Sequence, residues 1–128
     1  MKEELISLKT AKLAKEKGFT ESCEYAYVND FEEEWNLEDI EYNDGCVFDN
    51  KFHNNCSAPT QSLLQRWLRE VHDIDIIIHR QHNNPKMYYS SIWYKSKNPW
   101  NPPSAMNKLT YEEALEEGLY EALKLINK

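Results

Sequence analysis

Residues 74–80 decide the fold, and their sequence is Ile74-Asp75-Ile76-Ile77-Ile78-His79-Arg80, the most hydrophobic stretch of the chain. β-Branched residues at this density favour a β-strand. After a short turn comes a second run, rich in aromatic residues, with the sequence Tyr88-Tyr89-Ser90-Ser91-Ile92-Trp93-Tyr94. The two runs are close enough along the chain to pair as an antiparallel hairpin, which we expect at the centre of the sheet.

Successive side chains of a strand point to opposite faces, so the sequence lists what each face of this hairpin carries. In the first strand, Ile74, Ile76 and Ile78 share one face, and the other face takes Asp75, Ile77 and His79. In the second strand, one set is Tyr88, Ser90, Ile92 and Tyr94, and the other set is Tyr89, Ser91 and Trp93. If helices cover the all-isoleucine face, the opposite face presents Ile77 with one of the aromatic sets.

An apolar sheet face of this kind is seldom left bare. Three covers are open at this point: residues 29–57 of the same chain, a second subunit, or a ligand.

Three helices are expected around the hairpin. The first spans about residues 7–17 and ends at Gly18, where a left-handed cap belongs. The second follows Pro59 and has one apolar face, made of Leu63, Leu64, Trp67, Leu68 and Val71. The third begins with the capping box Thr110-Tyr111-Glu112-Glu113 and continues to about residue 126.

The fold class predicted from these elements is α+β, with about three helices packed on one face of a mainly antiparallel three- to four-stranded sheet. The expected order is α-β-β-α-β-β-α, with early strands at residues 23–28 and 46–48, and residues 1–128 are expected to form a single domain. Residues 29–44 are expected to be a long irregular excursion, with room for a short strand or a turn of helix. Residues 98–103 contain three prolines and are expected to interrupt regular structure.

Charge is distributed unevenly along the chain. The net charge is −7, and residues 21–50 hold eleven Asp or Glu and no Lys or Arg, whereas residues 51–110 hold three acids and eight bases. The three cysteines, with no secretory signal at the N-terminus, predict reduced thiols in a cytoplasmic protein. No apolar run is long enough to cross a bilayer, so no membrane partner is expected.

No catalytic or cofactor motif is present. The closest pattern to a metal site is His53-Asn54-Asn55-Cys56 with Cys46 nearby, which lacks the paired ligands of a structural zinc site. The chain has no Gly-x-Ser-x-Gly nucleophile motif, and its three glycines form no phosphate-binding loop. We therefore expect no cofactor and no metal, and we assign no catalytic residue.

Two segments of the chain carry a resemblance to known sequences. The first is residues 58–72, Ala58-Pro59-Thr60-Gln61-Ser62-Leu63-Leu64-Gln65-Arg66-Trp67-Leu68-Arg69-Glu70-Val71-His72, running into Ile74-Asp75-Ile76. The second is Tyr111-Glu112-Glu113-Ala114-Leu115-Glu116-Glu117-Gly118-Leu119 and its continuation to Ile126. Together they resemble a group of small uncharacterised proteins from phages and prophages of bacteria. The resemblance implies a phage or prophage setting, hence the host cell cytoplasm, and it carries no activity.

The function expected from the sequence is that of a phage- or prophage-derived accessory protein, a non-enzymatic protein-interaction module that contacts a protein partner or itself. The candidate binding residues are Tyr89, Trp93, His79, Arg80 and Lys95. One alternative is a module that binds single-stranded nucleic acid. Its nucleobases would stack on the aromatic sheet face, and nearby Lys and Arg side chains would contact the phosphates. A second alternative is a small metal-binding protein or enzyme.

Overall fold

The computed structural model describes residues 4–29, 34–39, 48, 50, 55–80, 86–95, 97–100 and 108–126. The chain divides into two compact units. The carboxy-terminal unit comprises residues 61–127 with residues 1–4, and the amino-terminal unit comprises residues 5–60 with residue 128. Each unit is described by itself.

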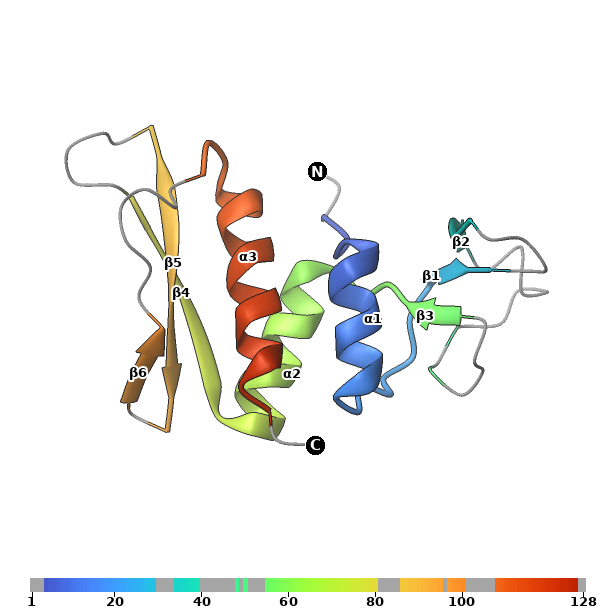
Figure 1. Ribbon diagram of the computed structural model, residues 1–128, viewed down its shortest axis with the longest axis horizontal. Coiled ribbons are helices and arrows are strands. Elements are labelled where there is room, and N and C mark those ends of the chain that lie inside the picture. The colour runs from blue at the N-terminus through green and yellow to red at the C-terminus, as the bar shows by residue number, and fades with distance from the viewer. Residues whose placement is uncertain are drawn as a thin grey trace. The chain divides into compact units, whose positions relative to one another are not determined.

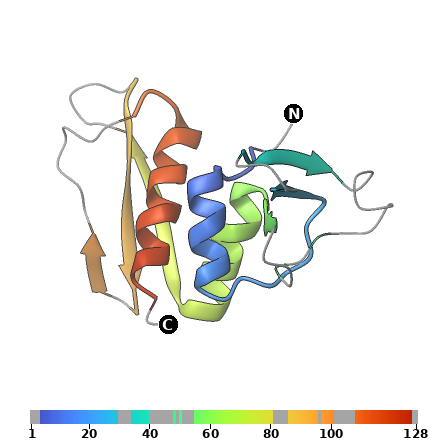
Figure 2. The ribbon, with the colours of Figure 1, turned by 45° about the vertical axis from the view of Figure 1, so that its right-hand side comes forward.

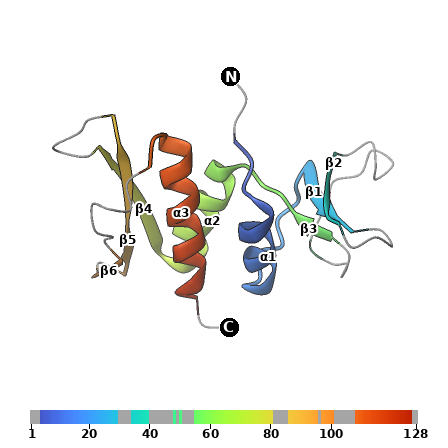
Figure 3. The ribbon, with the colours of Figure 1, turned by 45° about the horizontal axis from the view of Figure 1, so that its top comes forward.

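The carboxy-terminal unit is a three-stranded antiparallel sheet with two helices on one face. Its elements, in chain order, are α2 (Gln61–His72), β4 (Ile74–Arg80), β5 (Tyr88–Tyr94), β6 (Lys97–Trp100) and α3 (Tyr111–Lys124). The strand order is β4-β5-β6, so of the two hairpin strands expected at the centre of the sheet only β5 is central, and β4 is an outer strand of the described sheet. Both helices contact β4, and α3 also contacts β5, so they lie on the same side of the sheet (Figures 1 and 3).

The core of this unit lies between α3 and the isoleucine face of the hairpin. Ile76 pairs with Ile92 and Ile78 pairs with Ser90 across the two strands. Gly118 of α3 meets this face so closely that a Cβ there would lie 2.7 Å from Cγ2 of Ile76 and 3.0 Å from Oγ of Ser90. The helix therefore rests directly on the hairpin, and only a residue without a side chain fits at position 118.

Polar contacts hold the helices in place. The Thr110 side chain accepts a hydrogen bond from the Glu113 backbone N–H at 3.1 Å, so the predicted capping box forms at the start of α3. Gln61, buried at the start of α2, donates from Nε2 to the Glu112 carbonyl at 2.9 Å. The first contact satisfies a backbone N–H that the start of a helix leaves unpaired, and the second ties the start of α2 to the first turn of α3.

Two expectations about this unit are corrected. The stretch beginning at residue 98 was expected to interrupt regular structure, but Lys97–Trp100 forms β6, paired with β5 (Figure 2). Pro99 is tolerated because β6 is an outer strand of the described sheet and its pairing is interrupted by a register shift. Val71 was expected on the apolar face of α2, but it is 60% exposed, because Leu64, Trp67 and Leu68 already complete the buried stripe.

The amino-terminal unit contains α1 (Leu8–Glu16), β1 (Tyr25–Val28), β2 (Asn36–Asp39) and β3 (Asn55–Ser57). β1 is the central strand and pairs antiparallel with both neighbours. The helix is tied to β3 by the Lys15 ammonium, which donates to the Asn55 carbonyl at 2.7 Å. Gly18 follows α1 with φ 96°, so the predicted left-handed cap is present.

The predicted α+β class is confirmed, with three helices and antiparallel sheets among the described residues. The strands divide into two sheets of three, one in each unit, and α2 and α3 cover the sheet of the hairpin. None of the described helices is long and apolar enough to cross a membrane. The expected strand at residues 46–48 is described only at Phe48. Within the excursion expected at residues 29–44, Asn36–Asp39 forms β2, and residues 30–33 and 40–44 lie outside the described residues.

Replacing Gly118 with alanine tests the close approach of α3. Helix propensity alone would stabilise the variant by about 1 kcal/mol, whereas overpacking costs about 1–3 kcal/mol. We expect Gly118→Ala to lower the free energy of unfolding by about 1 kcal/mol in urea titrations, because the new methyl meets the Ile76 side chain. In an Ile76→Leu background, which removes the blocking γ2 methyl, the same substitution should lose most of its cost. An equal cost in both backgrounds would contradict the contact.

Candidate interaction surface

The face of the β4–β5 hairpin opposite α2 and α3 carries the candidate site, and we call it the open face. Three cross-strand pairs build it: Asp75 with Trp93, Ile77 with Ser91, and His79 with Tyr89. The alternation of side chains puts these six residues on one side, since their neighbours Ile76 and Ser90 meet Gly118 on the other. Of the two aromatic sets left open by the sequence, the open face therefore carries the set with Tyr89, Ser91 and Trp93.

The open face exposes Ile77 and Trp93, whereas Ser91 at its centre is buried, with 2% of its surface exposed. Ile77 is 42% exposed and Trp93 is 39% exposed, a level that buried core residues of this size do not reach. They occupy diagonal positions on adjacent strands, and both line the same hollow. Large side chains exposed together on a sheet are characteristic of a surface that contacts another molecule.

One end of the open face is ordered by His79. Its ring stacks on Tyr89 with the centroids 4.8 Å apart and an angle of 18° between the planes. Its Nε2 lies 2.9 Å from the hydroxyl oxygen of Ser91. The imidazole and the Tyr89 ring are thereby held in fixed positions, which lowers the entropy that a partner would lose in binding them.

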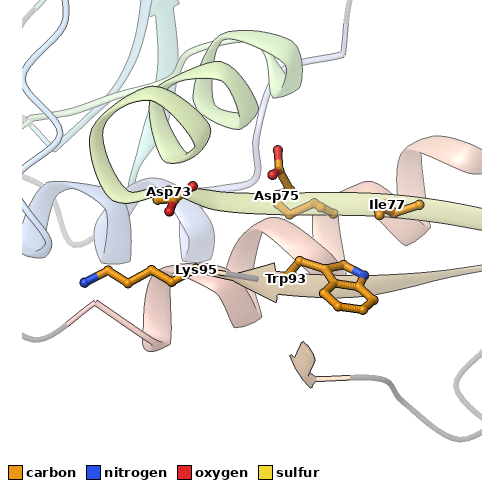
Figure 4. A pocket seen from close by; sticks show the side chains of 6 residues that line it. Asp73, Asp75, Ile77, Trp93 and Lys95 are labelled. Carbon is orange, nitrogen blue, oxygen red and sulfur yellow. The ribbon is translucent and has the colours of Figure 1, made fainter. Parts of the chain in front are cut away.

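The other end of the open face is a hollow of about 440 Å³ beside Trp93. It is lined by Asp73, Asp75, Ile76, Ile77, Trp93 and Lys95 (Figure 4). Figure 4 shows the Lys95 side chain extending away from the Trp93 ring, and its ammonium lies 5.4 Å from the ring centroid of Tyr94. The hollow therefore combines an indole ring with the carboxylates of Asp73 and Asp75.

Two residues with unusual backbone conformation border the hollow. Asp73 and Lys95 have φ of 56° and 50°, in the left-handed region that residues with a side chain rarely adopt. They face each other, with the Lys95 N–H donating to the Asp73 carbonyl at 3.2 Å. Asp73 makes the turn from α2 into β4, and Lys95 makes the turn out of β5. The hydrogen bond between them closes this end of the hairpin.

The structure brings together three of the five predicted binding residues. Tyr89, Trp93 and His79 share the open face. Arg80 belongs to the opposite face, where it pairs with Tyr88 and its guanidinium lies 5.4 Å from that ring. Lys95 lies beyond the strand, at the rim of the hollow. Asp73 was not predicted from the sequence. Its position at the hollow depends on its left-handed backbone conformation, which an Asp residue can adopt but which the sequence does not indicate.

The cysteines and histidines form no metal cluster in the part of the chain that the structure describes. There, no three His, Cys, Asp or Glu side chains lie close enough to hold a metal ion. Cys46 and His53 of the sequence pattern fall outside those residues. Cys23 and Cys56 are buried free thiols. Burial, with a smaller contribution from the Glu21 carboxylate, raises the pKa of the Cys23 thiol from 9.0 to about 12.

The raised pKa of Cys23 predicts an inert thiol. At pH 8 we expect iodoacetamide to leave Cys23 unlabelled in the folded chain and to label it after unfolding in urea, as read by peptide mass mapping. The raised pKa also stabilises the fold fully below pH 9.0, and this contribution is lost as the pH rises toward about 12. Cys23→Ala should therefore show a smaller loss of stability above pH 9.0 than the unmodified chain. In the iodoacetamide experiment, equal labelling of Cys23 in the folded and the unfolded protein would contradict the burial of this thiol.

Comparisons with known proteins do not assign the open face a role. A scan against protein-family models, a search of curated proteins and a search of solved structures each found no match. The resemblance to phage and prophage proteins stays a prediction, and the open face is interpreted from its own residues.

Proposed function

We propose that this chain is a non-enzymatic protein-interaction module that binds its partner with the open face of the β4–β5 hairpin. The observation that carries the proposal is the exposure of Ile77 and Trp93, at 42% and 39%, at diagonal positions of the face away from α2 and α3. Trp and Tyr are enriched among the residues that dominate the energy of protein interfaces. The open face holds one of each, on two paired strands.

The groups around the patch support a protein partner. An apolar centre with polar groups at its edge is the usual anatomy of a protein interface. Here Ile77 and Trp93 form the centre, and Asp73, Asp75 and His79 supply hydrogen-bonding groups around them. The His79 ring is already fixed by Ser91 and Tyr89.

The charges beside Trp93 favour protein over nucleic acid. Bases could stack on the exposed rings, but a nucleic-acid site also needs cations for the phosphates. Asp73 and Asp75 line the hollow beside Trp93, and the Lys95 ammonium is directed toward Tyr94 instead. The net charge of −7 adds a long-range repulsion. Phosphate binding would therefore be opposed where the indole ring is most accessible.

The setting proposed for this module is a phage or prophage, and its place of action is the host cell cytoplasm. Support comes from the resemblance of residues 58–78 and 111–126 to phage and prophage proteins. These segments build α2, β4 and α3, the elements that position the open face. The module would then be an accessory protein that acts by contact.

Photo-crosslinking from the centre of the open face tests this function. We would place p-benzoyl-phenylalanine at position 77 and irradiate the protein in bacterial host cells. A matched control carries the same group at position 71, because Val71 is also an exposed apolar residue of this unit but lies on α2. We expect a discrete protein adduct from position 77 and none from position 71.

The same adduct tests whether Trp93 is an anchor of the interface and whether the partner is a protein. Adding Trp93→Ala should weaken the adduct from position 77 about tenfold or more if the indole is an anchor of the interface. Absence of any protein adduct from position 77, or an adduct with nucleic acid in its place, would overturn the proposed function.

A further inference from the structure

We infer that the molecule bound by the open face is a second copy of this chain, in a symmetric dimer. The inference rests on the proposed function and names its partner. Two copies would pack face to face, related by a two-fold axis that lies between the sheets, at right angles to the strands, over the Ile77–Ser91 pair. In a two-fold interface each contact occurs twice with its members exchanged, so the surface must be complementary to itself.

The open face has this self-complementary order along both strands. In β4 it presents Asp75, Ile77 and His79, and in β5 it presents Trp93, Ser91 and Tyr89 at the paired positions. The axis reverses the strand direction of the second copy, so Asp75 lies over His79 of the second copy and Trp93 lies over its Tyr89. Ile77 lies over its own equivalent, and the buried Ser91 lies beside it and holds His79. Each of the other residues of the open face thus faces a chemically suitable one.

Each of these contacts is favourable in kind. A carboxylate, which accepts hydrogen bonds, faces an imidazole, whose ring N–H donates them. An indole faces a phenol ring, and aromatic pairs of this type are stabilising beyond the area that they bury. Two isoleucines meet on the axis, where burial removes the exposed 42% of Ile77 from water. Sheets that pack in this way stand about 10 Å apart and interdigitate their side chains.

The hollow gives the second copy a place for its ring. It has a volume of about 440 Å³, lies beside Trp93, and is open on the same face. In the proposed arrangement the Tyr89 ring of the second copy enters it, held by its stacking on His79. The symmetry repeats the contact, so each copy inserts one ring and receives one.

The face is favoured over the strand edge as the contact. β4 is an outer strand of the described sheet, and an outer strand is a second route to dimers through backbone pairing. Here Gln65 of α2 donates from Nε2 to the Ile76 carbonyl at 3.1 Å. This side chain occupies an outward backbone acceptor near the middle of β4, so pairing with another strand would first have to displace it.

A charge exchange across the proposed axis tests the inference. Sedimentation velocity of the full chain over a range of concentrations would give the dimer dissociation constant. We expect Asp75→Lys and His79→Glu each to raise it about tenfold or more, because like charges or unmatched groups then meet across the axis. The double variant Asp75→Lys/His79→Glu should recover most of the lost affinity, since lysine then meets glutamate of the second copy.

The recovery cannot arise within one copy. Asp75 and His79 are four residues apart on an extended strand, about 13 Å, which exceeds the screening length of about 8 Å at physiological salt. Val71→Asp, a charge placed at an exposed site of α2, serves as the control and should leave the dissociation constant unchanged. Far-ultraviolet circular dichroism checks that each variant is folded.

Three outcomes would overturn the inference. These are a chain that stays monomeric at all concentrations, a dimer indifferent to the single substitutions, and single effects that the double variant only adds together. A monomer that still forms an adduct with a different protein from position 77 would remove the second copy as partner and leave the proposed function standing. A dimer with the charge exchange recovered, and a self-adduct from position 77, would support both.

Discussion

The contact between Gly118 of α3 and the isoleucine face of the hairpin is the constraint on which the rest of the carboxy-terminal unit depends. With room for no side chain at position 118, the helix rests against Ile76 and Ser90. That contact selects which face of β4 and β5 is buried. Because side chains alternate along a strand, it also decides that Asp75, Ile77 and Trp93 face away from the helices. The open face is thus a consequence of core packing.

Much of this could be predicted from periodicity, because periodicity reports which side chains share a face. The hairpin, the two faces of β4 and the capping box at Thr110 all follow from spacing in the sequence. Val71 shows the limit: its spacing matches the apolar stripe of α2, but the stripe is complete without it, and the residue is 60% exposed. β6 was missed because Pro99 argues against a strand unless the strand is known to be an outer one.

The site was predictable to the same degree. Tyr89 and Trp93 share a face because they occupy alternate positions of β5, but it is the register of the hairpin that places His79 beside them. Arg80 was included only as a nearby basic residue and belongs to the other face. Asp73 and Lys95 border the hollow through left-handed turns. No residue pattern predicts a left-handed backbone conformation at an Asp or a Lys, because the surrounding structure imposes it. The acidic border of the open face therefore could be identified only from the structure.

The register of the hairpin against α3 is the central claim, and nuclear Overhauser contacts of isoleucine methyl groups measure it directly. In a sample with labelled isoleucine methyls, we expect the γ2 methyl of Ile76 to show a strong contact with the α-protons of Gly118, and the γ2 methyl of Ile77 to show none. A contact from Ile77 to Gly118, with none from Ile76, would mean that the register of β4 is shifted by one residue, so that its other face meets α3. It would place Asp75, Trp93 and Tyr89 beneath the helices and contradict the open face.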